Sequence, residues 1–392
     1  MTNPSRFHSP DIAIVGGGIA GLCAGIALQD QGNEVAVYEA ASDLRATGAG
    51  LWIPPNGMAA LNHLGVADEL LDRGICIERT EIRKIDETRL ISTDIASLAT
   101  ELGYDHPLLA VHRGDLIDVL AAELPEGAIY CDQRCESVNT ATPSVSFADG
   151  ATVSPTVVIG ADGIASTVRD EVAPSSTPEY AGAVAYRGVT ETALPDEAFE
   201  TGTVYWGGAG SFGYSAIGSD RAWWFASIPA TQPEAAPEES PSVLQERYAN
   251  YPYPVPQLIE DTGSEALIRT PLSTLHSLTT WTQGQVALVG DAAHAMPPTL
   301  SQGSAQAMED AVALDRTIDQ HGLTPTGLTA YESQRKSRAE ALIRMSRVQG
   351  RLARLSHPVV TKLRDILFRI TPDSVVQRQN HQMFATKMRS RT

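Results

Sequence analysis

The residues best suited to chemistry near the start of the chain form a glycine-rich turn. Residues 11–21 (DIAIVGGGIAG) are a short apolar run followed by Gly16, Gly18 and Gly21 in a G-x-G-x-x-G pattern, with Ala20 inside it. In such a turn the first glycine permits a tight bend and the second lets a pyrophosphate approach the backbone. The third lets the following helix pack closely on the strand. The pattern predicts a strand, a dinucleotide-binding turn and a helix whose N-terminal amides face the phosphates.

An acidic residue closes the second predicted strand. Residues 34–39 (EVAVYE) place Glu39, which Ala40 follows, 18 positions after Gly21. A carboxylate at this position accepts hydrogen bonds from the ribose hydroxyls of an adenosine. Because it would repel a 2′-phosphate, the turn favours FAD or NAD over NADP. It does not choose between FAD and NAD.

Two later turns each carry an aspartate directly after an apolar strand. Residues 157–163 (VVIGADG) end in Asp162 and Gly163, and residues 286–291 (VALVGD) end in Gly290 and Asp291. An aspartate in this place has two interpretations. It can bind a hydroxyl of a cofactor, or it can cap the helix that follows.

In their order and spacing, the three turns resemble those of the single-component FAD-dependent aromatic-ring monooxygenases, the para-hydroxybenzoate and salicylate hydroxylase type. The resemblance extends to about residue 350. It implies that Asp162 and Gly163 serve both FAD and NAD(P)H, and that Gly290 and Asp291 hold the ribityl chain of the flavin. Further contacts along FAD are implied for Arg45, Ala49, Gly50, Arg113 and Gly303. A guanidinium such as that of Arg113 matches a pyrophosphate, although a surface salt bridge is its alternative role.

The resemblance also implies an activity. The expected enzyme is an FAD-dependent monooxygenase that uses NAD(P)H and O2 to hydroxylate an aromatic or heteroaromatic small molecule through a flavin C4a-hydroperoxide. Because the cofactor carries this chemistry, no nucleophilic side chain is needed. The alternatives are a flavin epoxidase or a tailoring oxygenase acting on an alkene or polyketide, and a flavoprotein that binds FAD without turnover. A tryptophan halogenase is disfavoured, since Ala226 stands where its motif has a second tryptophan.

The third turn departs from the family pattern at two positions. The family usually continues with Pro-x-x-Gly-Gln-Gly-x-Asn, whereas this chain has Pro298, then Ser301 in place of the first glycine and Ala305 in place of the asparagine. FAD binding survives these changes if the contacts come mainly from the backbone. The geometry around the flavin ring is the property they put in question.

Several residues are candidates for the substrate side of the flavin. Pro298 is expected to place backbone near the reactive edge. Arg187 can pair with a substrate carboxylate or with a structural acid, and His294 can transfer a proton or stabilise its own turn. The aromatic candidates are core or pocket residues, since strand aromatics usually pack. They are Trp52, Trp206, Tyr214 and Trp224.

The pattern of apolar residues predicts an α/β fold of two interlocked domains and a tail. A Rossmann-like FAD-binding domain is expected from residues 1–75, 105–175 and 270–350. An inserted antiparallel β-sheet substrate domain is expected from 76–104 and 176–269, followed by C-terminal helices from 351–392. With a single dinucleotide turn, NAD(P)H has no Rossmann domain of its own and is expected to meet the flavin in a shared groove.

Charge is distributed unevenly along the chain. Residues 335–392 hold 14 Lys and Arg against 3 Asp and Glu, while residues 1–334 hold 15 against 44. The acidic body argues against nucleic-acid binding. The basic tail has apolar residues at helical spacing, which predicts amphipathic helices. These can dock on the acidic body, form a dimer contact, or lie on a membrane surface.

Bulk properties exclude further classes. No apolar run approaches the ~20 residues that span a bilayer, and the first ten residues contain no apolar signal core. The four cysteines lack zinc-site spacing, so no metal site is expected. We expect a cytoplasmic monomer or homodimer without stable membrane insertion.

Overall fold

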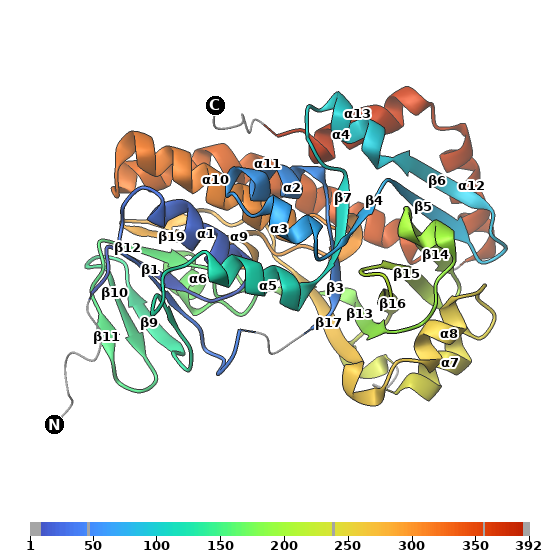
Figure 1. The fold of residues 1–392 in the computed structure, drawn as a ribbon, viewed down its shortest axis with the longest axis horizontal. Coiled ribbons are helices and arrows are strands. Elements are labelled where there is room, and N and C mark those ends of the chain that lie inside the picture. The colour runs from blue at the N-terminus through green and yellow to red at the C-terminus, as the bar shows by residue number, and fades with distance from the viewer. Residues whose placement is uncertain (1–8, 45–47, 237–239, 356, 387–392) are drawn as a thin grey trace.

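The computed structural model describes residues 9–44, 48–236, 240–355 and 357–386. Two large sheets organise these residues (Figure 1). The six-stranded sheet runs in the order β18 (Thr282–Gln283), β19 (Val286–Leu288), β12 (Val157–Gly160), β1 (Ile12–Val15), β2 (Val35–Tyr38) and β8 (Ile129–Tyr130). The seven-stranded sheet runs in the order β17 (Ile268–Thr274), β13 (Glu179–Thr190), β16 (Ala222–Pro229), β15 (Gly210–Ala216), β14 (Thr201–Gly207), β5 (Arg79–Lys84) and β6 (Arg89–Asp94).

The six-stranded sheet is parallel apart from its edge strand β18. β1, β2, β12 and β19 are wholly buried, as expected for a parallel sheet with both faces covered. Val15 lies opposite both Gly160 and Tyr38, and Gly160 lies opposite Leu288. The carboxyl ends of these four strands therefore meet at one edge, where ligands of open α/β sheets bind.

Helices cover this sheet. The helices of this first part of the molecule are α1 (Ile19–Gln29), α2 (Pro55–His63), α3 (Ala67–Leu71), α5 (Arg113–Ala122), α6 (Thr167–Val172), α9 (Asp291–His294), α10 (Gly303–His321) and α11 (Pro325–Ala353). α10 packs against α1, α2 and α11. Two small three-stranded sheets complete this part: β3 (Gly50–Ile53), β7 (Leu108–His112) and β4 (Ile75–Ile77), and β11 (Thr152–Val153), β10 (Ser144–Phe147) and β9 (Cys135–Asn139). The expected α/β class is confirmed.

The seven-stranded sheet is antiparallel except where β14 pairs with β5. One face packs on α7 (Pro241–Tyr248) and α8 (Val255–Glu260) and buries a core of its own. The other face meets β3 of the first part. α4 (Ile95–Glu101) follows β6, and short 3-10 turns occur at η1 (Asp196–Phe199), η2 (Pro233–Ala235), η3 (Ser264–Ala266) and η4 (Pro298–Leu300).

The C-terminal tail does not dock all of its amphipathic helices on the body through their apolar faces. α11 is one helix of 29 residues, followed by α12 (Pro358–Ile370) and α13 (Asp373–Phe384). α13 returns to the body, because Phe384 is buried and its carbonyl accepts a hydrogen bond from Tyr104 Oη at 2.8 Å. The apolar residues of α12 face outward instead of docking on the body. Among the described helices, none has the length and apolar character needed to cross a membrane.

Candidate functional site

The three turns predicted to hold the cofactor are in contact with one another. A Cβ on Gly16, whose φ is +109°, would lie 2.4 Å from the carbonyl oxygen of Ala161, next to the second turn. A Cβ on Gly290 would lie 2.6 Å from that of Ala20. Only glycine fits either place, since real Cβ atoms do not approach so closely. We call the three turns (residues 16–21, 161–163 and 290–291) the cofactor cradle.

The cradle opens onto free space at its glycines. A Cβ on Gly18, Gly163 or Gly303 would meet no atom within 4 Å. Gly18 caps the N-terminus of α1, and Gly303 begins α10. Both helix ends present unpaired N–H groups and partial positive charge, which suit a pyrophosphate and other electron-rich groups. The arrangement fits FAD, because the backbone is open to a ligand at Gly18 and Gly163 and two long helices begin at open glycines.

Glu39 supports the first turn and retains capacity for a ligand. Its carboxylate accepts hydrogen bonds from the N–H groups of Gly17 at 2.7 Å and Ala41 at 2.8 Å. An ionised carboxylate has about four acceptor sites, so a ribose hydroxyl can still bind. Arg113 stands near enough for the charge of Glu39 to oppose the lowering of the Arg113 pKa by burial. Arg45, predicted on the same line of contacts, lies outside the described residues.

Asp162 serves its own turn. Its carboxylate accepts hydrogen bonds from the hydroxyl of Ser166 and from the N–H of Val168 at 3.1 Å, and burial raises its pKa. The helix-capping interpretation therefore describes what Asp162 does in the protein. Gly163, at φ +75°, leaves its backbone exposed toward the free space of the cradle.

Arg169 joins the second and third turns, a role that the sequence did not reveal. Its guanidinium is almost fully buried and donates to the carbonyls of Ile164 at 2.8 Å and Ala292 at 3.4 Å. The only signal was its position seven residues after Asp162 in the motif.

A buried charged network stands behind the third turn. Asp310 accepts hydrogen bonds from the N–H of Gly290 at 2.9 Å, from His294 Nε2 at 2.6 Å and from Arg335 Nε at 2.8 Å. His294 is wholly buried, which favours the role of stabilising its own turn. A role in proton transfer stays a prediction.

The network continues along α10 toward α2. Glu309 is bound by Asn56 Nδ2 at 2.7 Å, Arg335 Nη1 at 2.5 Å and Arg338 Nε at 2.8 Å. The two guanidinium groups hold the pKa of Glu309 below its usual range despite burial. We call His294, Glu309, Asp310, Arg335 and Arg338 the charged network.

Asp291 differs from these supporting residues. Its side chain is exposed, and within the described ranges no hydrogen bond engages its carboxylate. The surrounding protein nevertheless raises its pKa, with His294 opposing. An accessible acid crowded by protein atoms is suited to bind a polyol hydroxyl.

The alternation of side chains along strands decides which aromatic residues face the cradle. The facing side carries Ser215, whose hydroxyl accepts a hydrogen bond from Trp52 Nε1 at 2.8 Å, and Trp223, which would lie 2.2 Å from a Cβ on Gly50. Tyr214 and Trp224 point to the other side. Trp224 is wholly buried and donates to Thr262 Oγ1 at 2.8 Å. Both residues belong to the core beside α7 and α8, which favours the packing alternative for Tyr214 and Trp224, and their pocket roles stay predictions.

The remaining substrate-side candidates lie between the two parts. Trp52 is buried edge-on against Trp223. Trp206 lies on the same face of the sheet as Ser215 and Trp223. The guanidinium group of Arg364, from α12, covers its ring, with the guanidinium carbon 5.0 Å from the ring centroid. Arg187 is half-buried and donates to Thr270 Oγ1 at 3.3 Å. Burial and the positive charge of Arg113 lower the Arg187 pKa.

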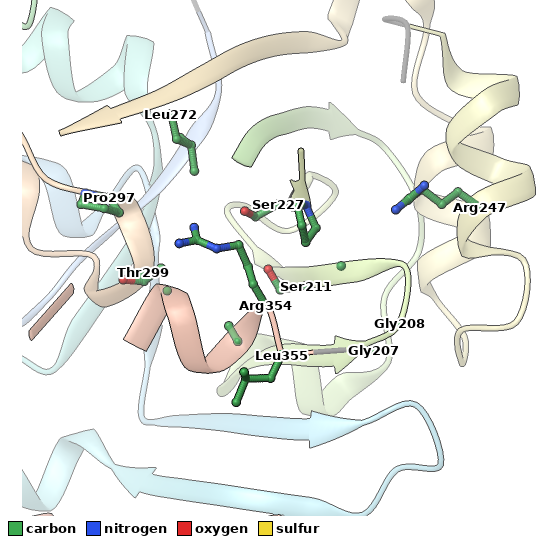
Figure 2. Close-up of a pocket in the computed structure, with 14 residues that line it drawn as sticks. Gly207, Gly208, Ser211, Ser227, Arg247, Leu272, Pro297, Thr299, Arg354 and Leu355 are labelled. Carbon is green, nitrogen blue, oxygen red and sulfur yellow. The ribbon is translucent and has the colours of Figure 1, made fainter. Parts of the chain in front are cut away.

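A cavity of about 180 Å³ lies between the seven-stranded sheet, the turn after α9 and the end of α11 (Figure 2). The sheet contributes Ser211, Ser227 and Leu272, and the turn contributes Pro297 and Thr299. The side chain of Arg354, the C-cap of α11, extends into the same space (Figure 2). Burial and the nearby Arg351 lower the Arg354 pKa, and none of the described ion pairs involves Arg354.

None of the predicted substrate-side residues lines this cavity. Pro298 comes nearest, since it is exposed between the cavity residues Pro297 and Thr299. Arg354 was visible in the sequence only as one of several basic residues of an amphipathic helix.

Comparison with known proteins agrees with this geometry. The profile of the FAD binding domain family matches residues 9–346. The chain is 32% identical over 367 residues to an aurachin C monooxygenase/isomerase of Stigmatella aurantiaca, covering 92% of this chain and 94% of that protein. It is 31% identical over 349 residues to a 6-hydroxynicotinate 3-monooxygenase of Bordetella bronchiseptica, covering 86% and 90%.

The chain belongs to the FAD-dependent aromatic-ring monooxygenase family. A third relative, a 2-heptyl-3-hydroxy-4(1H)-quinolone synthase of Pseudomonas aeruginosa, is 30% identical over 381 residues, covering 95% and 97%. The crystal structure of Klebsiella pneumoniae HpxO complexed with FAD and uric acid superposes with a TM-score of 0.84 at 25% identity, covering 96% and 97%.

Within this monooxygenase, the two departures from the family pattern have different consequences. Ser301 adopts the left-handed conformation with φ +53°, which favours the glycine usual in the family. Ala305 is wholly buried, and its Cβ would lie 3.2 Å from a Cβ on Gly57. Small residues at both positions allow α10 to approach α2, so the asparagine of the family pattern has little room here.

Proposed function

We propose that this monooxygenase hydroxylates a nitrogen-containing aromatic heterocycle that carries a hydroxyl or oxo group on its ring, bound in the cavity between Pro297, Leu272 and Arg354. The proposal rests on the cavity itself, which combines an apolar wall, two serine hydroxyls and the guanidinium groups of Arg247 and Arg354. Its volume of about 180 Å³ accommodates an aromatic ring, since a cavity of ~150 Å³ binds benzene. The names of three relatives, which refer to a hydroxynicotinate, a quinolone and urate, support a heterocycle.

The cradle residues would hold FAD in an extended conformation. We propose that Gly18 and the N-terminus of α1 bind the pyrophosphate with Arg113, that Glu39 binds the adenosine ribose, and that Asp291 binds the ribityl chain. Bound FAD would supply oxygen activation after reduction by NAD(P)H. The backbone of Gly163 and the N-terminus of α10 at Gly303 would face the flavin ring.

Arg354 is the proposed substrate-positioning residue. A guanidinium remains protonated at all physiological pH values and donates only. Its low-dielectric surroundings strengthen attraction to an anionic oxygen. A ring whose oxygen is held as an anion is electron-rich, which favours attack on an electrophilic oxygen. Ser211 and Ser227 can donate to or accept from the ring nitrogen.

Arg187 has a separate proposed role. With Arg113 it places positive charge between the sheet and the cradle. This charge suits the phosphates of NAD(P)H as it approaches the flavin. Since NAD(P)H is the reductant, we expect the enzyme to act in the cytoplasm, as a monomer or homodimer.

The test is a substrate panel given to the purified, FAD-loaded protein. We expect 6-hydroxynicotinate, a 4(1H)-quinolone or a hydroxyquinoline to stimulate NADH or NADPH oxidation and to gain one oxygen by mass spectrometry. Oxidation that yields only hydrogen peroxide with every heterocycle would contradict the proposal. An epoxide formed from an alkene would instead support the epoxidase alternative.

A further inference from the structure

The orientation of α12 is the reverse of that expected for a helix on a water-facing surface: its apolar side chains are exposed and an arginine is buried. A surface helix normally buries its apolar stripe and exposes its charges. In α12, Arg364 is 7% exposed, donates to the carbonyl of Leu352 at 3.0 Å and pairs with Asp365 at 2.7 Å. Phe368 packs on Trp206 with ring centroids 5.8 Å apart. The inward face is thus partly ionic, and it anchors the helix to the body.

The outward face is apolar over its whole length. Six of the eleven large hydrophobic side chains exposed in the described residues lie on α12, with exposures from 41% to 69%. Their spacing puts them on a single stripe. They are Val359, Val360, Leu363, Ile366, Leu367 and Ile370. A contiguous apolar stripe of this kind marks an interaction surface.

The charges around this stripe indicate what covers it. Lys362 is exposed on its border, and Arg351 and Arg378 are exposed on the flanking helices. They belong to a segment, residues 335–392, with 14 basic against 3 acidic residues. A second copy meeting α12 with α12 would oppose like charges, because a two-fold contact joins identical patches. An anionic surface is complementary to the same charges.

We propose that α12 binds flat on the surface of an anionic phospholipid bilayer, with its apolar stripe in the headgroup region. The position of α12 suggests a function for its contact with the bilayer. Arg354 and Leu355, which line the cavity, lie directly before α12 in the chain. The bilayer would therefore lie beside the cavity and deliver lipid-dissolved aromatic substrates to it. Binding of α12 to the bilayer does not depend on the proposed hydroxylation, whereas delivery of substrate to the cavity rests on it.

The test measures binding of the FAD-loaded protein to sedimented vesicles, without substrate. We expect binding to phosphatidylcholine vesicles that contain phosphatidylglycerol, and weaker binding to phosphatidylcholine alone or at high salt. Leu363→Glu should lower the partition coefficient at least about tenfold. Val243→Glu makes the same charge change at an exposed valine on α7 and should stay within about twofold of wild type. Retained flavin absorbance shows that each variant is folded.

Three outcomes would overturn the proposal. The first is failure of the wild-type protein to sediment with anionic vesicles. The second is equal loss of binding in both glutamate variants. The third is a dimer in analytical ultracentrifugation that Leu363→Glu converts to a monomer, without vesicle binding, since a second copy would then cover the stripe. Hydroxylation of a soluble heterocycle, measured separately, would be unaffected by any of them.

Discussion

The cofactor cradle and the substrate cavity are built in different ways. The cradle consists of three turns at the ends of neighbouring parallel strands, locked by Gly16 and Gly290, where a Cβ would clash, and by the buried charged network. The proposed substrate cavity is lined by several strands of the seven-stranded sheet, by Arg247 of α7, by the turn after α9 and by the end of α11. The cradle is therefore set by local turns, whereas the shape of the cavity depends on how distant elements pack.

The largest expected effect comes from breaking the support of the cradle. Arg335→Met would leave Glu309 and Asp310 buried without their main cation, which costs about 3–5 kcal/mol of unfolding free energy. Thermal unfolding and FAD retention measure it. Arg344→Met removes an exposed arginine from the same helix and serves as the control. Equal stability of the two variants would refute the structural role of the network.

A change in the cavity should alter substrate binding and leave stability and FAD binding unchanged. Arg354→Gln removes the charge proposed to hold the substrate oxygen, and a hydrogen bond between charged groups contributes about 1.5–3 kcal/mol. We expect KM for a heterocycle with a hydroxyl or oxo group to rise about 10- to 100-fold, with unchanged FAD affinity and melting temperature. Steady-state kinetics measure the effect on substrate binding, and a separate FAD titration measures the effect on cofactor binding. Loss of FAD together with substrate binding would show that cavity and cradle are not independent.

Low pH should reduce the unfolding free energy that the buried carboxylates behind the cradle contribute. The pKa values of Glu309 and Asp310 are lowered in the folded protein from ordinary values of 4.5 and 3.8, with their ion pairs outweighing burial. Both groups therefore stabilise the fold above these values, and this stability is lost as pH falls through the lower, folded values. Unfolding free energy measured from pH 6 to pH 3 should fall, and less steeply in Glu309→Gln. An identical pH dependence in that variant would contradict the assignment.

The smallest effect is expected at Ser301. A non-glycine residue in the left-handed region costs about 1 kcal/mol. Ser301→Gly should therefore stabilise the protein by roughly that amount, less the greater flexibility of glycine when unfolded. Differential scanning calorimetry checks the sign. A lower melting temperature would mean that the serine side chain makes a compensating contact.

The cradle could be predicted because its determinants are local. The glycines at 16, 18 and 21 are required by a turn of a few residues, and strands of similar length bring their ends together. The cavity could not be predicted in the same way. A shift of one residue moves a strand side chain to the other face, and the sequence did not determine that Ser215 and Trp223 face the cradle while Tyr214 and Trp224 do not.

Long-range partners were also beyond the sequence. The buried position of His294 depends on Asp310, sixteen residues away, and on Arg335, farther along the chain. The inverted orientation of α12 depends on an arginine pairing with its neighbour above Trp206. Periodicity predicts which residues share a face of a helix but not which face the body covers.

Titration of FAD onto the apoprotein, followed by flavin fluorescence, measures whether the three distant turns form one FAD site. Gly18→Ala and Asp291→Asn add no clash with protein atoms and remove no internal hydrogen bond among the described residues. We therefore predict one FAD per chain, unchanged stability of the apoprotein, and an FAD dissociation constant raised about tenfold or more in each variant. No FAD binding by the wild-type protein, or wild-type affinity in both variants, would show that the three turns do not form an FAD site.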